Sequence, residues 1–248
     1  MNAALRYYEA VTRIMQAVMD HEQESLGRAA DLLVEKIAED RLIHVFGTGG
    51  HSIMGAMEMF QRAGGLYPVN AIFPPRISVT DSHPNTERLV GYAPAILDHY
   101  GVRTGDVLII VNVNGINAVT IDSALEAKRR GVTVIAVTSR EFASHVPADS
   151  PARHPSTQNL HDLADIVIDC HVPVGDAVLD IPGVSHKVAA SSTFPVVLIL
   201  NCLVALTVER MAQRGLEPLV RFSANLPGGR ERSLKIQERY RGRIVHQY

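Results

Sequence analysis

The sequence predicts an α/β protein with a five-stranded parallel sheet wrapped by helices, preceded by an N-terminal helical segment. Five short runs rich in Val and Ile lack alternation of apolar and polar residues, which is typical of strands buried on both faces. Helical patterns separate these runs, and repeated β–α units imply a parallel sheet. The 248 residues, 46% of them hydrophobic, are enough to bury a full core. The predicted strands are Leu42–Phe46, Val69–Phe73, Val107–Val113, Val132–Thr138 and Ile166–Asp169.

The chain divides into three predicted parts. Residues 1–40 form the N-terminal helical segment, because residues 3–39 contain no proline and a single glycine and place apolar residues at helical spacing. Residues 41–215 form the sheet domain, in which the apolar run Phe194–Val208 predicts a buried core helix. Residues 216–248, with prolines, glycines and several arginines, are expected to form a surface arm. Within the sheet domain, helices are expected over 52–63, 86–100, 117–130 and 157–164, and a polar connecting loop over 141–158.

Charge and composition exclude several classes of partner. The chain has 24 Lys+Arg against 26 Asp+Glu, and its pI is near 6.6. It therefore offers no basic surface for a phosphate backbone, and no nucleic acid partner is expected. The N-terminal stretch MNAALRYYEAVTRI has no apolar core of a signal peptide, and Phe194–Val208 is shorter than the roughly 20 residues of a membrane span. We therefore expect a cytoplasmic protein with no membrane partner.

The metal-binding residue types do not form a recognisable pattern. Cys170 and Cys202 lie in apolar runs and are too few for a disulfide framework or a four-cysteine zinc site. Among the 11 histidines, His154, His161 and His171 lack the i,i+4 spacing of a helical zinc site. No metal and no cofactor are therefore expected.

Two glycine-containing loops follow predicted strands, where ligands bind in an open parallel sheet. Glycines let the backbone approach an anion closely, and a helix start presents free N–H groups to it. Each loop could instead be an ordinary strand-to-helix turn with capping residues. Two such loops on separate strands favour a phosphorylated ligand. The candidate binding residues are Gly47, Thr48, Gly49, Gly50, His51 and Ser52 in the first loop, and Asn112, Asn114, Gly115 and Asn117 in the second.

A dinucleotide site is the natural competitor. Gly47-x-Gly49-x-x-Ser52 has only two of the three glycines of the Rossmann fingerprint, and no Asp or Glu stands near the end of the next strand for a ribose hydroxyl. Arg76 could meet a 2′-phosphate, so NADP stays an alternative. A P-loop is excluded, because no Gly-Lys-Ser/Thr follows the glycines.

The order and spacing of these motifs resemble those of the SIS (sugar isomerase) domain family over roughly residues 40–210. Val45–Ser52, followed by a helix ending in Arg62–Gly65, resembles the first phosphate loop of that family. Gly105–Ile110, Asn114-Gly115 and Ala127–Thr138 resemble its second half. The likeness is greatest to single-domain proteins near the phosphoheptose isomerases, carried by Arg153–Ser156 and Gly175–Ala177.

The resemblance implies a flavodoxin-like αβα sandwich that binds phosphosugars, often with its active site at a subunit interface. It also implies that the start of the Phe194–Val208 helix lies near the ligand. That start carries the candidate binding residues Ser191, Ser192 and Thr193, and capping of the helix is the simpler interpretation for Ser192 and Thr193. The second loop departs from the family, whose serines and threonines are replaced here by asparagines; an amide NH2 still donates to phosphate.

Isomerisation of a sugar phosphate needs a base that moves a proton between adjacent carbons. On the helix expected over 52–63, Glu58 shares a side with His51 and Arg62, and the resemblance implies a carboxylate on this helix. Glu58 and Arg62 could instead be an exposed i,i+4 ion pair. His186 and Lys187, before the apolar helix, are further acid/base candidates.

These observations favour an aldose–ketose phosphosugar isomerase, or a close relative acting at the same carbons. The alternative is a non-catalytic phosphosugar sensor, since the same domain also serves in regulators; no helix-turn-helix pattern is evident. The N-terminal helical segment and the polar face of helix 52–63 exceed what one αβα layer needs, and closed homo-oligomers are common. A homodimer or a dimer of dimers is therefore expected.

Overall fold

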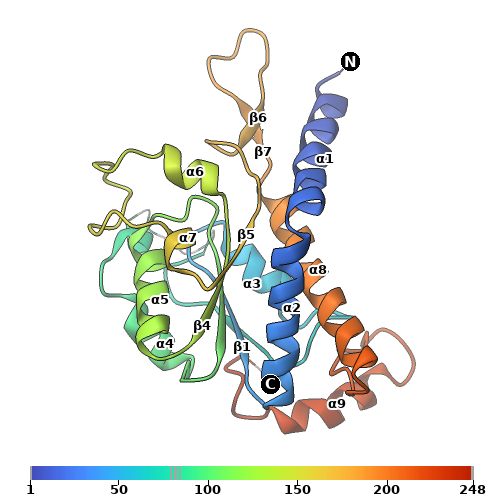
Figure 1. The fold of residues 1–248 in the computed structure, drawn as a ribbon. Coiled ribbons are helices and arrows are strands. Elements are labelled where there is room, and N and C mark those ends of the chain that lie inside the picture. Colours follow the sequence, from blue (N-terminus) through green and yellow to red (C-terminus); the bar gives the residue numbers. More distant parts are fainter. Residues whose placement is uncertain (1, 79, 81–82, 84, 247–248) are drawn as a thin grey trace.

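The computed structural model describes residues 2–78, 80, 83 and 85–246 and confirms the predicted fold class (Figure 1). A five-stranded parallel sheet has the strand order β2-β1-β3-β4-β5, which is the flavodoxin-like order. Each of the five predicted runs overlaps one of these strands. Their bounds are Ile43–Gly47 (β1), Val69–Ile72 (β2), Val107–Val111 (β3), Thr133–Thr138 (β4) and Ile166–Asp169 (β5).

Helices cover both faces of the sheet (Figure 1). α2 and α8 lie on one face, together with α3, and α4 and α5 lie on the other. The helices are Ala3–His21 (α1), Gln23–Ala38 (α2), Ile53–Met59 (α3), Ala93–His99 (α4), Ala118–Arg129 (α5), Arg140–His145 (α6), Leu160–Leu163 (α7), Thr193–Gln213 (α8) and Gly229–Arg239 (α9), with one 3₁₀ turn at Thr86–Arg88 (η1).

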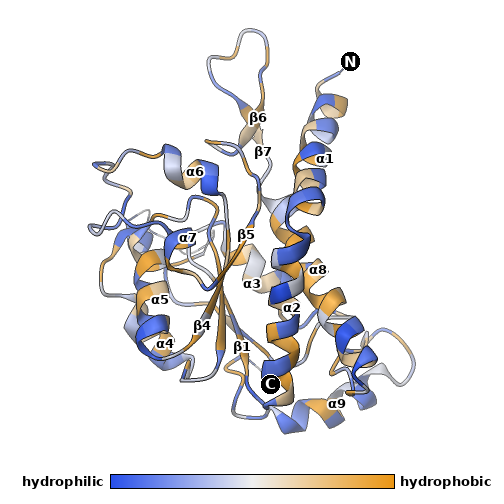
Figure 2. Ribbon diagram, viewed as in Figure 1, coloured by the Kyte–Doolittle hydropathy of each residue, from blue (hydrophilic) through white to orange (hydrophobic). Residues whose placement is uncertain are grey.

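The central strand β3 shows why the strands lack polar alternation. Val107, Ile109 and Val111 belong to the hydrophobic cluster shared with α2, α3 and α8. Leu108 and Ile110 point the other way and belong to the cluster shared with α4 and α5. Successive side chains of a strand point to opposite faces, so a strand with two covered faces is apolar at every position. Figure 2 shows the strands and most of α8 in hydrophobic colours.

The N-terminal helical segment is a pair of helices that meet at Glu22. Buried residues of α2, such as Leu26 and Leu33, belong to the same hydrophobic cluster as the sheet. α1 projects past the sheet beside a two-stranded antiparallel hairpin formed by β6 (Ala177–Leu179) and β7 (Val188–Ala190) (Figure 1). The hairpin, which the sequence analysis did not identify, is joined to α1 by the hydrogen bond from the Tyr7 hydroxyl to the Ala190 carbonyl, 2.6 Å long.

Several expected helices are shorter than the sequence pattern suggests. The helix expected over 52–63 ends at Met59, because Phe60 is extended and Gln61 has a left-handed φ of 53°. The helix expected over 86–100 is divided into η1 and α4, with Gly91 at a φ of 83° between them. Glycine adopts this left-handed conformation without strain, so the chain turns here instead of continuing the helix.

The expected core helix is present as α8, which is longer than the apolar run that predicted it. Among the described residues, α8 is the one helix that is long and apolar enough to cross a membrane by length and composition. In this fold Ile199, Leu200 and Leu203 are buried in the main hydrophobic cluster with α2 and the sheet.

The C-terminal residues are more closely tied to the core than a surface arm would be. Tyr240 and Ile244 are buried in the main cluster. Arg239 and Arg243 both form ion pairs with Asp40, at 2.9 Å and 3.0 Å. The segment 216–246 therefore packs around one end of the sheet domain and places α9 there (Figure 1).

Candidate functional site

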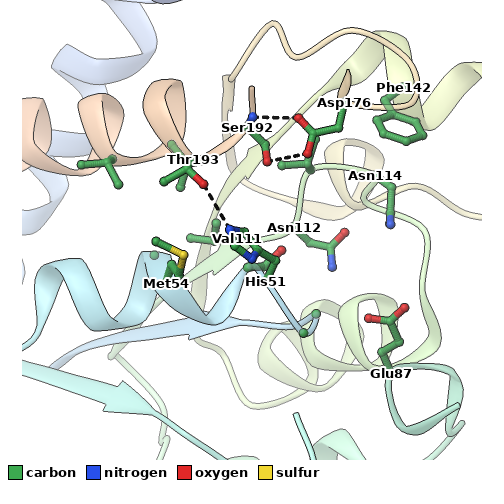
Figure 3. Close-up of a pocket in the computed structure, with 17 residues that line it drawn as sticks. His51, Met54, Glu87, Val111, Asn112, Asn114, Phe142, Asp176, Ser192 and Thr193 are labelled. Carbon is green, nitrogen blue, oxygen red and sulfur yellow. Dashed lines mark hydrogen bonds between the residues drawn. The ribbon is translucent and has the colours of Figure 1, made fainter. Parts of the chain in front are cut away.

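A cavity of about 210 Å³ lies at the carboxyl ends of β1 and β3, where the strand order changes direction (Figure 3). Ligands of open α/β sheets bind at this position. The volume is below the roughly 300–1,000 Å³ of drug-sized pockets, so it suits a small occupant. The polar lining residues are Gly49, Gly50, His51, Ser52, Glu87, Asn112, Asn114, Asp176, Ser192 and Thr193.

The first predicted loop forms one wall of this cavity. A Cβ atom at Gly47 would lie 2.0 Å from the Ser52 carbonyl oxygen, so only glycine permits the tight turn that leads from β1 into the loop. Gly49, Gly50, His51 and Ser52 line the cavity, whereas Gly47 and Thr48 lie beneath it. The fully buried Thr48 hydroxyl forms a 2.6 Å hydrogen bond with the Thr120 hydroxyl, which fixes the loop to α5.

The second predicted loop supplies amide groups to the same cavity. The Asn112 Oδ1 atom accepts a hydrogen bond from the Gly115 N–H at 2.9 Å, and the Asn114 Oδ1 atom accepts one from Ile116 N–H at 3.2 Å. These bonds orient both side chains so that their NH2 groups remain to donate to a ligand (Figure 3). The side-chain NH2 of Asn117 donates to the Ala152 carbonyl, so Asn117 and Gly115 shape the loop without lining the cavity.

The start of α8 forms the third wall, and Asp176 holds it in place (Figure 3). Its Oδ1 atom accepts hydrogen bonds from the Ser191 and Ser192 backbone N–H groups, at 2.8 Å and 2.7 Å. Its Oδ2 atom accepts a bond from the Ser192 hydroxyl at 2.8 Å. A carboxylate at a helix N-terminus is favourable. Asp176 therefore provides the capping contact that was expected from Ser192 and Thr193, and the Thr193 hydroxyl contacts His51 at 3.2 Å.

Glu87 is a cavity residue that the sequence analysis did not select. It comes from η1, in the segment after β2, and its Oε2 atom lies 3.2 Å from the position that a Cβ on Gly49 would occupy. Burial raises the pKa of the Glu87 carboxyl above its usual range, and a hydrogen bond from the Gly50 backbone N–H partly offsets this effect. A carboxyl with a raised pKa in a ligand-sized cavity is a typical feature of an acid/base site. Glu87 lies fifteen residues after the end of β2, and its approach to Gly49 and Gly50 forms only in the folded chain, so no local signal in the sequence points to it.

The structure does not bring the other predicted acid/base candidates into this cavity. Glu58 accepts a hydrogen bond from the Asn201 side chain at 3.1 Å and lies 3.5 Å from Arg62, on a separate groove between α3 and α8. His186 and Lys187 belong to the hairpin region, and Lys187 faces α1. Of the four predicted acid/base residues, His51 lines the cavity, whereas Glu58, His186 and Lys187 do not.

The lining determines how an anion can be held. Among the described residues, no Lys or Arg lines the cavity, so its donors are backbone N–H groups, hydroxyls and amide NH2 groups. Nor do the described residues contain a group of three or more His, Cys, Asp or Glu side chains placed to hold a metal ion. The cavity combines a neutral donor set with a carboxyl of raised pKa and a histidine.

A flavodoxin-like sheet with a small polar cavity at its switch point is typical of α/β proteins that bind small ligands. The SIS domain model matches residues 6–139, and the chain belongs to this family. It is 36% identical to a UPF0309 protein of Shouchella clausii, over 98% of this chain and 99% of the relative. It is 38% identical to a UPF0309 protein of Caldanaerobacter subterraneus, over 97% of this chain and 98% of the relative.

Solved structures share the fold at lower sequence identity. A phosphoheptose isomerase from Neisseria gonorrhoeae matches with a TM-score of 0.50 at 19% identity, covering 82% of this chain and 96% of its own. The sugar isomerase domain of an RpiR transcription factor from Sphaerobacter thermophilus also has a TM-score of 0.50, at 16% identity, covering 96% and 97%. The NanR protein of Vibrio vulnificus, complexed with ManNAc-6P, has a TM-score of 0.50 at 14% identity, covering 99% and 71%.

Proposed function

We propose that this protein binds a small sugar phosphate in the cavity and interconverts its aldose and ketose forms. The observation that carries the proposal is Glu87, a partly buried carboxyl that lines the same cavity as the two loops rich in hydrogen-bond donors. The fold relatives include a phosphoheptose isomerase and a protein complexed with ManNAc-6P, which supports a phosphosugar as ligand.

The donors of the two loops bind the phosphate. The backbone N–H groups of Gly49–Ser52 and the NH2 groups of Asn112 and Asn114 converge on one cavity, and hydrogen bonds to an anion are stronger than those between neutral groups. Neutral donors suit a phosphate that must leave again with the product, because they bind less tightly than paired arginines would.

Glu87 acts as the base. It removes a proton from the carbon next to the carbonyl, exchanges that proton with solvent and returns a proton to the carbonyl carbon, which converts an aldose into a ketose through an enediol. A raised pKa makes the carboxylate a stronger base than an ordinary Glu. His51, hydrogen-bonded to Thr193, donates a proton to the carbonyl oxygen as the enediol forms and takes one back from the hydroxyl of the neighbouring carbon as the ketose forms.

Glu58 is the alternative base, and it requires a different assembly. Because Glu58 lies on the groove between α3 and α8, it reaches a substrate only if that substrate is bound to a neighbouring subunit.

We also propose a homodimer or a dimer of dimers. Met57 and Phe194, next to this groove and at the start of α8, have 56% and 46% of their surface exposed, and together with the groove they offer apolar surface to a second copy of the chain.

A sensor that binds the sugar phosphate without converting it is the second candidate. It is favoured by the likeness to the sugar isomerase domain of an RpiR transcription factor and to NanR. We propose a cytoplasmic location for either function, because charged sugar phosphates do not cross an apolar bilayer unaided.

Replacing Gly49 by valine tests the location of the site. A Cβ atom at this position would lie 3.2 Å from both the Asn112 Nδ2 and the Glu87 Oε2 atoms, and the valine methyl groups would extend further into the cavity. We expect Gly49→Val to weaken binding of sugar phosphates at least about a hundredfold by calorimetry, which corresponds to roughly 2.7 kcal/mol. Circular dichroism should show an unchanged fold. A variant that binds as tightly as the parent protein would place the site elsewhere.

A further inference from the structure

A second cavity, of about 470 Å³, lies between α9, the segment 221–225 and the chain that follows α3. It shares no lining residue with the first cavity. Arg221 and Arg230 line this cavity, and among the described residues none that lines it is acidic. The cavity is therefore separate from the proposed active site and cationic.

Arg221 is the unusual residue of this second cavity. Its Nε and Nη2 atoms are buried and have no hydrogen-bond partner in the part of the chain that the structure describes. Its guanidinium carbon lies 4.0 Å from the centre of the Tyr67 ring. Burial lowers the pKa of the Arg221 guanidinium from its usual value. A buried charged donor without an acceptor costs free energy, because it has lost water and gained nothing in return.

The surroundings fix the backbone of Arg221 and the ring beneath its guanidinium. The Arg221 backbone N–H donates to the Gly65 carbonyl, and the Gly64 N–H donates to the Arg221 carbonyl, both at 2.9 Å. The Tyr67 hydroxyl donates to the Ser233 carbonyl on α9 at 2.7 Å, which fixes the ring under the guanidinium. Stacking on this fixed ring limits the movement of the guanidinium and so lowers the entropic cost of binding.

The charge of the C-terminal segment favours an anion at this place. Residues 216–248 contain seven Lys and Arg but three Glu, although the whole chain carries a net charge of −2. Such a concentration of positive charge attracts small anions.

We propose that the second cavity binds a small phosphorylated metabolite, with its phosphate held by Arg221 and Arg230. The planar guanidinium matches the oxygen geometry of phosphate and forms paired hydrogen bonds with it. The volume leaves room for a polar body attached to the phosphate. This proposal does not depend on the activity assigned to the first cavity. α3 begins at the first cavity, and Gln61 and Ala63, which follow its end, line the second cavity. The two cavities are therefore connected by α3 and the chain after it.

The test separates the two cavities by using Gly49→Val protein, in which the first is blocked. Inorganic phosphate and glucose 6-phosphate are titrated by calorimetry and by NMR of the arginine side-chain Nε–Hε groups. The Arg221 resonance is assigned by its loss in Arg221→Met. We expect the Arg221 Nε–Hε resonance to shift with inorganic phosphate, with glucose 6-phosphate or with both, and the shift to reach saturation below about 10 mM. A shift with glucose 6-phosphate alone would indicate that the ligand body is also recognised. A shift with inorganic phosphate alone would indicate that the phosphate suffices.

Arg221→Met should weaken binding at least about tenfold, whereas Arg241→Met should leave it within about twofold. Arg241 is a matched control, because it is an exposed arginine of the same segment, paired with Glu238 outside the cavity. If Arg221→Met fails to fold, Arg230→Met on the exposed side of the cavity replaces it. The proposal is overturned if the Arg221 resonance does not move with either probe, or if calorimetry finds equal binding in the variants of the two lining arginines and in Arg241→Met.

Discussion

Glu87 is the residue on which the proposed chemistry depends. It is a carboxyl in a cavity whose other lining groups are mostly neutral, and burial raises its pKa. A carboxyl in this state is a better base once ionised but is protonated at a higher pH than an exposed Glu. The same property that makes it suitable for proton transfer therefore makes it sensitive to acid.

The decrease in activity at low pH should reflect protonation of Glu87. As the pH falls, Glu87 takes up a proton and can no longer act as a base, so kcat/KM should decrease with an apparent pKa above the ordinary Glu value of 4.5. Steady-state rates with a converted sugar phosphate, measured between about pH 4 and 8, provide the profile. The residual activity of Glu87→Gln should lack this decrease. An identical decrease in that variant would assign it to another group.

Residue-level roles were the hardest to predict from the sequence. The choice of Glu58 assumed a helix through residue 63 whose polar side faces the ligand, but α3 ends at Met59 and Glu58 contacts Asn201 of α8. Glu87 lies at the start of the helix expected over 86–100, and only the folded chain shows that it approaches Gly49. Which polar side chains meet is decided by tertiary packing, which local patterns do not contain.

At the scale of elements, the junction between the hairpin and α8 determines the third wall of the cavity. Asp176 has a left-handed φ of 65° and accepts hydrogen bonds from two backbone N–H groups and the Ser192 hydroxyl. These contacts join a segment of irregular structure to the N-terminus of a long core helix. Because they involve an ionised acceptor, each is stronger than an ordinary hydrogen bond.

Asp176→Ala should therefore destabilise the fold. The change leaves the Ser191 and Ser192 N–H groups without their acceptor, and we expect a loss of about 1–3 kcal/mol in the free energy of unfolding. Urea denaturation followed by circular dichroism measures this loss. Asp180→Ala, an exposed residue of the same hairpin, is the matched control and should change stability by less than about 0.5 kcal/mol. Equal effects of the two substitutions would show that the carboxylate does not stabilise α8.

Buried elements were predictable because their pattern follows directly from burial. The five strands are continuous apolar runs in the sequence because helices cover both faces of the sheet. The two hydrophobic clusters, one on each face, confirm this burial. The hairpin β6–β7 was missed because its strands have three residues each and are partly exposed. Strands this short carry too few side chains for a periodicity to be recognised.

At the scale of the whole molecule, the exposed side of α8 and its groove with α3 indicate an association surface. Leu200, Val204 and Val208 line the groove, and Met57 lies exposed beside it. Large exposed apolar surfaces are rare on monomers. The C-terminal segment contributes to the molecule's shape in a way that its composition did not reveal, since Tyr240 and Ile244 are core residues within a region rich in arginine.

Light scattering should find at least a dimer, with a mass about twice that of the 27.1 kDa chain. Ala205→Arg places a charge in the groove and should shift the protein toward monomer, because burying an unpaired charge is costly. Gln213→Arg, at the exposed end of α8, is the control and should leave the mass unchanged. A monomeric parent protein would contradict the proposal, and a dimer insensitive to Ala205→Arg would place the interface on another surface.

The most direct test of the central claim is the transfer of solvent deuterium into a sugar phosphate. The protein is incubated in D2O with a panel of aldose and ketose phosphates, and NMR follows deuterium at the carbon next to the carbonyl. We predict incorporation by the parent protein and by Glu58→Gln, and a rate lowered by about 10²–10⁴ in Glu87→Gln with little change in binding. Binding without incorporation would make the protein a sensor, and full activity of Glu87→Gln would contradict the role given to this carboxylate.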